Sequence, residues 1–250
     1  MKTVICLVHG AGHQPLHYKY LIDALRRHGL TVAAPPLPTS GYDDASATKT
    51  HLEDVARVRE YLVPFLEQGY EAILVGHSYG GRIITQAAAG LTGEERAAAG
   101  QDGGVVALVY IAAFTEKEQP LTPEILGVPP EDVNPATKLL WPEAAIRAMY
   151  HDIEPGRANE AVALLQRQSP RDLDGAAVCK SSDVPVPKRY VACRQDRVIS
   201  FGTQLQFAEA AVAKVVAELE SGHSPWLRDD GIRAIVDCVL EFSRRRQDDV

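Results

Sequence analysis

The chain has 250 residues, of which 46% are hydrophobic and 24% are charged, values typical of a globular protein large enough to bury a substantial core. The formal net charge of −7 argues against nucleic acid or an anionic membrane surface as a partner. The sequence contains no run of the ~18 apolar residues that a membrane span needs, so we expect no association with a membrane.

The N-terminal segment and the cysteines bear on the cellular compartment. Residues 1–8 hold one lysine and a short apolar run, which is too short for a secretion signal and is typical of a first strand. The four cysteines are scattered, with no pair at redox or zinc-binding spacing. We therefore expect a cytoplasmic protein with reduced cysteines and with no metal or other cofactor. The sequence leaves the oligomeric state open, with a homodimer as one option.

Apolar and amphipathic segments alternate along most of the chain. The segments that are apolar as in buried strands are residues 3–8, 31–34, 72–75, 105–113, 188–193 and 213–219. The segments with helical spacing of apolar side chains are residues 16–28, 49–67, 203–211 and 230–244, and a further helix begins near Tyr79. Residues 90–104 are typical of a polar connection. The alternation predicts one α/β domain over residues 1–250, with a mainly parallel, doubly wound sheet.

The segment from about residue 115 to residue 183 interrupts this alternation. It is rich in proline and acidic residues, with short helical pieces at residues 142–150 and 160–168. It lacks a convincing core of its own, so we predict a helical cap insertion rather than a second domain. The side chains that could line a pocket beneath this cap are those of Leu126, Val128, Leu139, Leu140, Trp141, Met149 and Tyr150. Plain packing would explain each of them equally well.

The stretch that points most directly to chemistry is Gly-His-Ser-Tyr-Gly at residues 76–80. A Gly-x-Ser-x-Gly sequence between a strand and a helix is the nucleophile-elbow pattern, in which a strained turn exposes the serine hydroxyl. Serine is a weak nucleophile unless a base lies beside it and amides stand ready for the oxyanion. Because the five letters also occur in ordinary glycine-rich turns, the assignment of Ser78 depends on partners elsewhere in the chain.

Two candidate partners follow later strands. Asp196 comes three residues after the segment 188–193, and His223 follows the segment 213–219. Side chains just after the strands of a parallel sheet meet at one edge, where ligands bind. The chain order Ser78, Asp196, His223 is the nucleophile, acid and base order that accompanies the elbow pattern, so we predict a catalytic triad. Asp183 is the rival acid, but it precedes its strand and should lie at the opposite edge.

An oxyanion hole in this arrangement takes one amide from the residue after the nucleophile and one from a loop early in the chain. Tyr79 supplies the first amide, and Ala11, in the glycine-rich loop of residues 9–13, is the candidate for the second. The glycines of this loop disfavour the helix that would gather its histidines and His17 around a metal. His77, at the variable position of the elbow, is predicted to be a packing residue.

The motifs match one known group of proteins. They are Val-His-Gly-Ala-Gly-His at residues 8–13, Val-Gly-His-Ser-Tyr-Gly-Gly at 75–81, Tyr-Ile-Ala-Ala-Phe at 110–114, Asp196, and Ser-Gly-His-Ser-Pro at 221–225. In these motifs the chain resembles α/β-hydrolase-fold proteins of the group that contains plant methylesterases, hydroxynitrile lyases and their microbial relatives. The resemblance covers residues 1–114 and 188–243, and only loosely the insertion. It implies an α/β-hydrolase fold with the triad and the two amide donors assigned above.

Two positions differ from the lyases of this group. Where those lyases carry a lysine directly after the catalytic histidine, this chain has Ser224, and where they carry a threonine after the opening histidine, it has Gly10. Both differences favour an esterase, and Ser78 excludes the aspartate nucleophile of dehalogenase-like relatives. The resemblance therefore implies a serine hydrolase that cleaves a carboxylic ester or lactone. Because the insertion supplies apolar side chains and has no lysine-rich stretch for a polyanionic substrate, we expect a small to medium, largely uncharged substrate.

Three alternatives use the same residues. One is a hydroxynitrile-lyase-type enzyme that cleaves a carbon–carbon bond, and another is a small-molecule receptor that retains the triad. The third is a hydrolase directed at an epoxide or an amide. Turnover of a short aryl ester, with covalent labelling of Ser78, favours the esterase, whereas tight ligand binding without turnover favours the receptor.

Overall fold

The computed structural model describes residues 2–115, 129–132, 134 and 140–245. Within these residues the centre is a six-stranded sheet of order β2-β1-β4-β5-β7-β8, whose neighbouring strands all run parallel. Its strands are β1 (Thr3–Val8), β2 (Thr31–Ala33), β4 (Glu71–His77), β5 (Gly104–Ile111), β7 (Lys188–Cys193) and β8 (Lys214–Leu219). Every residue of β4 and β5 is buried, as expected for strands that are covered on both faces of a parallel sheet.

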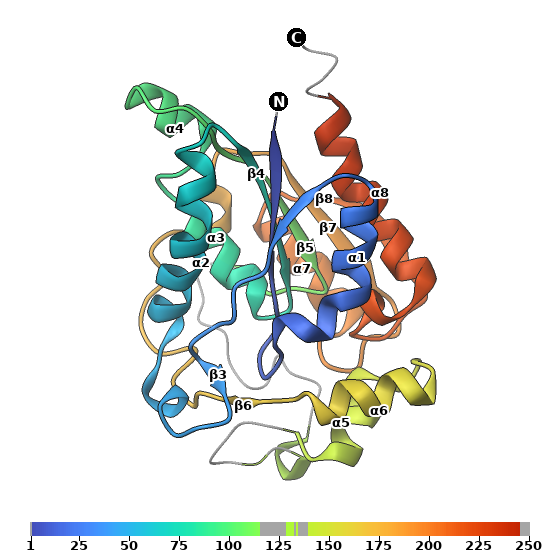
Figure 1. The fold of residues 1–250 in the computed structure, drawn as a ribbon. Helices are drawn as coiled ribbons and strands as arrows, with labels where there is room; N and C mark the ends of the chain where they lie inside the picture. The colour runs from blue at the N-terminus through green and yellow to red at the C-terminus, as the bar shows by residue number, and fades with distance from the viewer. Residues whose placement is uncertain (1, 116–128, 133, 135–139, 246–250) are drawn as a thin grey trace.

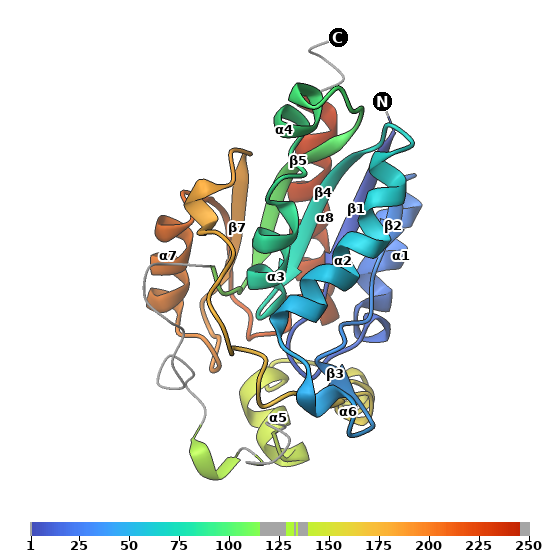
Figure 2. The ribbon, with the colours of Figure 1, turned by 90° about the vertical axis from the view of Figure 1, so that its left-hand side faces the viewer.

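Helices cover both faces of the sheet (Figures 1 and 2). One face carries α1 (Lys19–Arg27) and α8 (Asp229–Arg245), and the other carries α2 (His51–Leu66), α3 (Gly80–Ala88) and α7 (Phe201–Ala210). A capping box between Thr50 and Glu53 starts α2, whose apolar stripe then packs inward. None of the helices in the described part of the chain is long and apolar enough to cross a membrane.

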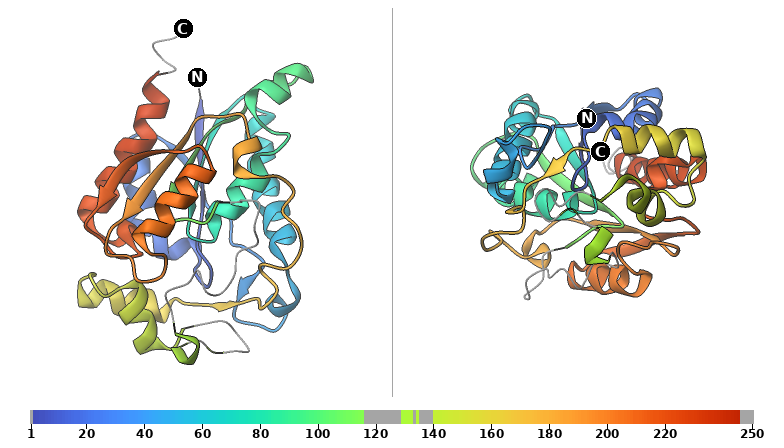
Figure 3. Two further views of the ribbon diagram at one scale, coloured as in Figure 1. Left: turned by 180° about the vertical axis from the view of Figure 1, so that it is seen from behind. Right: turned by 90° about the horizontal axis from the view of Figure 1, so that it is seen from below.

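The helices of the described segment between β5 and β7 lie at the carboxyl ends of the sheet strands (Figures 1 and 3). We call the described residues 140–187 of this segment the insert. It holds α5 (Pro142–Met149), α6 (Pro155–Ala163) and the short strand β6 (Arg167–Gln168). Strand β6 pairs antiparallel with β3 (Ser40–Gly41), so the insert is tied to the loop that follows β2.

The predicted alternation of strands and helices is confirmed, with two local differences. Residues 93–98, predicted as part of a polar connection, form α4 (Gly93–Ala98), which starts at a capping box between Thr92 and Glu95. The helix predicted at residues 160–168 is displaced towards the N-terminus as α6, because the Glu154 carboxylate caps its first amides. Capping in both places decides the helix start more strongly than the apolar spacing does.

Candidate active site

The Gly-x-Ser-x-Gly stretch forms a sharp turn between β4 and α3. Ser78 has a φ of +50°, in the left-handed region that serine rarely adopts. Its amide donates to the carbonyl oxygen of Ile111 (3.1 Å), and its own carbonyl oxygen accepts from the amide of Phe114 (3.0 Å). These two bonds tie the turn to the end of β5 and hold the strained backbone in place. The predicted strand, turn and helix around Ser78 are therefore present.

Close packing explains the glycines of this turn. A Cβ atom at Gly76 would lie 2.6 Å from the carbonyl oxygen of Gly80, and one at Gly80 would overlap the carbonyl oxygen of Val8. The same contacts place the loop after β1 against the turn, because a Cβ atom at Gly10 would lie 3.2 Å from Cβ of Ser78. Two segments about 70 residues apart in sequence thus meet at the serine.

Asp196 and His223 are paired at the carboxyl ends of β7 and β8. Oδ2 of Asp196 lies 2.8 Å from Nδ1 of His223, and both side chains are buried. The Asp196 carboxylate also accepts from the Val198 and Ile199 amides (2.7 and 3.0 Å) and from Nε2 of Gln204 (3.0 Å). A carboxylate held by this many donors fixes the imidazole with its proton on Nδ1, which leaves Nε2 as the acceptor.

The rival acid lies elsewhere. Asp183 is exposed in a short turn before β7, where its Oδ2 accepts from the amide of Lys180 (3.1 Å). Its Oδ1 lies 3.2 Å from the hydroxyl of Ser182. The Asp183 carboxylate thus bonds within its own turn. The carboxylate that bonds to His223 is that of Asp196.

The backbone amides of the loop of residues 9–13 differ in whether they have a hydrogen-bond partner. The amides of Gly10, Gly12 and His13 donate to Oη of Tyr18 (3.0 Å), Oε1 of Gln168 (2.8 Å) and the carbonyl oxygen of Gly10 (3.2 Å). The Ala11 amide has no hydrogen-bond partner among residues 2–115, 129–132, 134 and 140–245, and neither has the Tyr79 amide. Unpaired amides near a nucleophile are suited to stabilise a developing negative charge.

His77 does more than pack. Its Nε2 donates to the carbonyl oxygen of His223 (3.0 Å), so its Nδ1 is the acceptor for the Tyr18 hydroxyl (2.7 Å). The Tyr18 hydroxyl in turn accepts from the amide of Gly10 (3.0 Å). One buried phenol and one buried imidazole thereby connect the loop after β1, the elbow and the loop that carries His223. The sequence prediction of plain packing for His77 missed these polar contacts.

Four buried histidines surround the site in neutral form. Each has one ring nitrogen that donates to a carbonyl oxygen and one that accepts from an amide or a hydroxyl; they are His9, His13, His17 and His77. Burial lowers the pKa of His9 and of His17 to about 4, and it holds the pKa of His13 and of His77 well below the usual range. Among the described residues, no group of three or more histidine, cysteine, aspartate or glutamate side chains is arranged to hold a metal ion.

The residues predicted to line a pocket beneath the cap differ in location and exposure. Leu126, Val128 and Leu139 lie outside the described residues. Trp141 is 49% exposed, whereas Met149 and Tyr150 are buried. The Tyr150 hydroxyl donates to Nε2 of His13 (2.8 Å), so one of the predicted apolar candidates supplies a polar contact between the insert and the loop after β1.

Three polar residues near the site are not predicted from the sequence: Asp54 and Gln168 are buried, and Asp152 is partly buried. Asp54 accepts three hydrogen bonds, Gln168 bonds to the loop after β1, and Asp152 Oδ2 accepts from the amide of Gly222 (2.7 Å). Asp54 left a trace, because it occupies the helical spacing of the apolar stripe of α2, four residues before Val58. Gln168 and Asp152 left none, since the partners that tie them to the site, the amides of Gly12 and Gly222, are distant in sequence.

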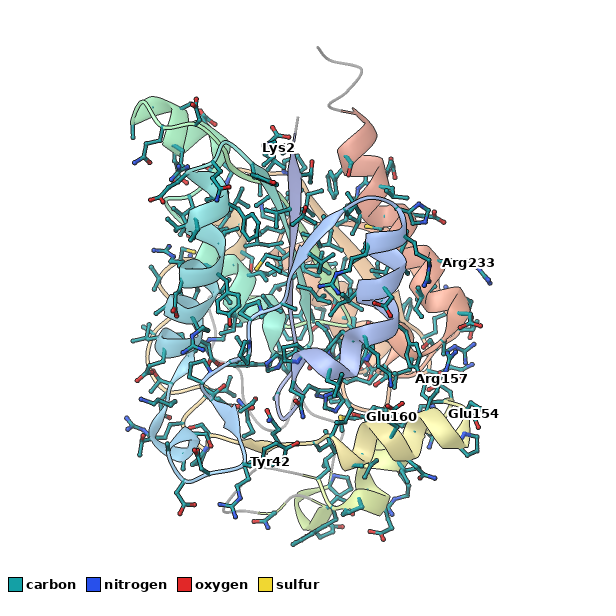
Figure 4. All side chains as sticks on the ribbon, viewed as in Figure 1. Lys2, Tyr42, Glu154, Arg157, Glu160 and Arg233 are labelled. Atoms are coloured by element: carbon teal, nitrogen blue, oxygen red, sulfur yellow. The ribbon has the colours of Figure 1, made fainter. Side chains whose placement is uncertain are left out.

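A surface groove of about 590 Å³ lies between α1 and α8. Arg157 and Arg233 are among its lining residues and are labelled in Figure 4, and none of the predicted site residues lines it. Acidic side chains, including those of Asp229 and Asp237, offset the arginines. The groove therefore has no single charge to select a ligand.

The chain belongs to the alpha/beta hydrolase family, whose model matches residues 7–236. The predicted α/β-hydrolase fold is confirmed, and so are the enzyme class and the resemblance to the methylesterase group. Several of the relatives carry hydrolase or esterase names. The chain is 28% identical over 236 residues to alpha/beta hydrolase nvfD of Aspergillus novofumigatus, with 91% of this chain and 92% of the relative covered.

Two further relatives carry esterase names. Methylesterase 17 of Arabidopsis thaliana is 27% identical over 224 residues, with 79% of this chain and 76% of the relative covered. A solved mutant of polyneuridine aldehyde esterase superposes with a TM-score of 0.76 at 20% identity, covering 97% of this chain and 100% of that one. The structural likeness concerns the fold alone.

Proposed function

We propose that the protein is a serine hydrolase that cleaves a small to medium, largely uncharged carboxylic ester or lactone. The observation that carries this proposal is the 2.8 Å pair of Asp196 and His223. The loop that carries this pair bonds to the elbow through Nε2 of His77 and the carbonyl oxygen of His223 (3.0 Å), and Ser78 in that elbow has a strained backbone. The ring centroids of His77 and His223 are 4.7 Å apart, which supports a close approach between the elbow and the loop that carries His223, here called the base loop. The name of Methylesterase 17, a relative over most of the chain, agrees with it.

In this mechanism the Ser78 hydroxyl attacks the ester carbonyl carbon while Nε2 of His223 takes its proton. The tetrahedral intermediate collapses, and the protonated imidazole gives that proton to the leaving alkoxide, which departs as the alcohol. A water molecule then attacks the acyl-enzyme with His223 again as base, and the acid is released. Asp196 keeps the imidazole in the required tautomer and stabilises its charged form.

The Ala11 and Tyr79 amides are the oxyanion donors in this proposal. Their lack of other partners within the described part of the chain supports the role, as does the contact between the loop after β1 and Ser78. Amides that are fixed before the reaction stabilise the oxyanion without a further cost of reorganisation. No metal ion is required by these steps.

The insert is the proposed cap, and it supports a preference for compact substrates. It lies at the ends of the strands and contributes buried apolar side chains such as Met149. An apolar cover excludes water and so strengthens the electrostatic effect of the amide donors. The free state of all four cysteines supports the expected cytoplasmic location.

The test is hydrolysis of p-nitrophenyl acetate together with labelling by a fluorophosphonate. We expect turnover, and labelling of Ser78 that is lost in Ser78→Ala. Short aryl and methyl esters should give a higher kcat/KM than a long-chain ester or an acyl-CoA. Absence of both labelling and turnover would contradict the proposal. Release of an aldehyde from a cyanohydrin without ester turnover would favour the lyase, and tight binding without turnover the receptor.

A further inference from the structure

A chain of buried polar side chains runs from the insert to both proposed oxyanion donors. It consists of Gln168, Thr39, Asp54 and the phenol of Tyr79, which we call the Gln168 network. All four residues are at most 3% exposed. They come from β6, from the loop before β3, from α2 and from the elbow, so the network joins four elements that are distant in sequence.

The direction of every bond in the network follows from its chemistry. Oε1 of Gln168 accepts from the amide of Gly12 (2.8 Å), and Nε2 donates to Oγ1 of Thr39 (3.1 Å). The Thr39 hydroxyl therefore donates to Oδ2 of Asp54 (2.6 Å), and the Tyr79 hydroxyl donates to the same oxygen (2.7 Å). A network whose donors and acceptors are matched in this way is rigid and keeps a single arrangement.

The two ends of the network lie next to the two proposed donors. At one end, Gly12 directly follows Ala11, whose carbonyl oxygen accepts from Nδ1 of His13 (2.8 Å). The peptide group between Ala11 and Gly12 is thus held from both sides. At the other end, the residue whose hydroxyl is held is Tyr79 itself, which carries the second amide. The network fixes each donor through its neighbouring group and leaves the donor free.

We propose that Gln168 is a positioning residue that sets the separation of the Ala11 and Tyr79 amides through Thr39 and Asp54. This inference rests on the proposed function. Because Gln168 belongs to β6, it makes the rate of acylation depend on the position of the insert. Amide donors must lie within about 3 Å of the oxyanion, and a misplacement of about 1 Å can cost 10²-fold in rate. A tie between the two donors therefore affects the transition state more than substrate binding.

Two substitutions cut the network and keep both backbone amides. Tyr79→Phe removes the hydroxyl and keeps the amide, and Gln168→Met removes both polar groups at similar length. We expect each to lower kcat for p-nitrophenyl acetate by ~10-fold and to change KM by less than ~3-fold, the pattern of a loss confined to the transition state. Affinity for phenylboronic acid, which forms a tetrahedral adduct with the serine, should fall in parallel with kcat.

The double variant tests the connection itself. If Tyr79 and Gln168 act through one network, Tyr79→Phe with Gln168→Met should cost clearly less than the product of the two single losses. Losses that multiply would overturn the proposal. Thr39→Val cuts the middle of the network, keeps the shape of the side chain and should reproduce the loss. It serves as the second test where Gln168→Met does not fold.

Matched controls separate positioning from general loosening. Tyr110→Phe removes another buried hydroxyl, which bonds to Thr85 (2.8 Å), and Ser169→Ala removes a buried hydroxyl next to Gln168 that bonds to the Lys49 carbonyl oxygen (2.6 Å). We expect both to keep kcat within ~2-fold. Equal losses in the controls, or wild-type kcat in folded network variants, would overturn the positioning role. If the wild-type protein were not labelled by the fluorophosphonate, the proposed function itself would be contradicted.

Discussion

Two sides of the site are built in different ways. The core side carries Ser78, Asp196 and His223, and the insert side carries Tyr150, Asp152 and Gln168. On the core side, each predicted reactive group follows its own strand, and local bonds hold it, such as the Val198 amide to Asp196 two residues before (2.7 Å). On the insert side, the bonds join distant residues: Gln168 to Gly12 across 156 positions and Tyr150 to His13 across 137. The reactive groups are thus encoded locally, whereas their support is encoded across the whole chain.

This difference predicts two scales of effect. Substitutions on the core side should remove the chemistry, because each takes away a group that bonds to the reacting atoms. Substitutions on the insert side should leave the chemistry intact and change its rate modestly, because they act through the position of another group.

Removal of the nucleophile should give the largest loss. We expect Ser78→Ala to lower kcat for p-nitrophenyl acetate by ~10⁶-fold with the fold intact, because the acyl-enzyme cannot form. His223→Ala should cost about as much, since the two residues act as one unit. The measurement is steady-state hydrolysis with circular dichroism as the check of folding. A variant with more than a tenth of wild-type activity would rule out the assigned triad.

Substitution of the acid should come next. We expect Asp196→Asn to cost ~10⁴-fold in kcat, because an amide in this place favours the wrong imidazole tautomer. The matched control is Asp183→Asn in the exposed turn before β7, which should keep nearly full activity. Steady-state kinetics of both variants decide the matter. A severe loss in Asp183→Asn together with a mild one in Asp196→Asn would reverse the assignment.

The core side could be predicted from the sequence because its patterns are short. An apolar run, a glycine-bounded serine and polar residues after two later strands are each visible within about ten residues. Strand β7 was predicted at its observed bounds, Lys188–Cys193. The elements missed or displaced were α4 and α6, where capping by Thr92 and Glu154 decides the start.

The insert side could not be predicted because its information lies in pairs of residues. The sequence around Gln168 contains no pattern that points to Gly12, and the sequence around Asp152 contains none that points to Gly222. Tyr150 was predicted as an apolar candidate, but its hydroxyl meets His13. Only the packing of the insert against the strand ends brings these partners together.

The buried histidines lie where the two sides meet, and they predict a dependence of stability on pH. Burial lowers the pKa of His9 and of His17 to about 4, so the unfolded chain binds protons first as the pH falls below 6.5. Burial raises the pKa of Asp54 to about 6, which has the opposite effect. His9 and His17 together outweigh Asp54 by about 2 kcal/mol between pH 7.0 and 5.5. Burial also lowers the pKa of His13 and of His77, which act in the same direction, so the free energy of unfolding should fall by more than about 2 kcal/mol.

Denaturant unfolding at the two pH values measures this change, which corresponds to more than ~30-fold in the unfolding equilibrium constant. His17→Gln removes one titrating imidazole, and its amide can still donate to the carbonyl oxygen of Ala161, the partner of Nε2 of His17 (3.0 Å). We expect the variant to reduce the loss by about 1 kcal/mol. Equal stability of the wild-type protein at pH 7.0 and 5.5 would contradict the prediction.

The smallest effect is expected where the insert meets the base loop. Oδ2 of Asp152 accepts from the amide of Gly222 (2.7 Å) and from Nη1 of Arg228 (3.2 Å), and Gly222 directly precedes His223. Asp152→Ala should lower kcat/KM by ~10-fold, because one lost bond of about 1.4 kcal/mol loosens the base. Asp152→Asn keeps an acceptor oxygen and should lose less.

Asp230→Ala is the matched control for this contact, because Asp230 also pairs with Arg228 (3.0 Å) while it accepts from the neighbouring Gly231 amide rather than from the loop that carries His223. It should leave kcat/KM within ~2-fold, since exposed ion pairs contribute little. The measurement is kcat/KM for p-nitrophenyl acetate under conditions in which each variant is fully folded, as thermal melting confirms. If Asp152→Ala matched Ser78→Ala in its loss, the insert would carry chemistry and the separation of the two sides would fail. If it matched Asp230→Ala, the insert would not support the base at all, and the contact with Gly222 would be one of packing only.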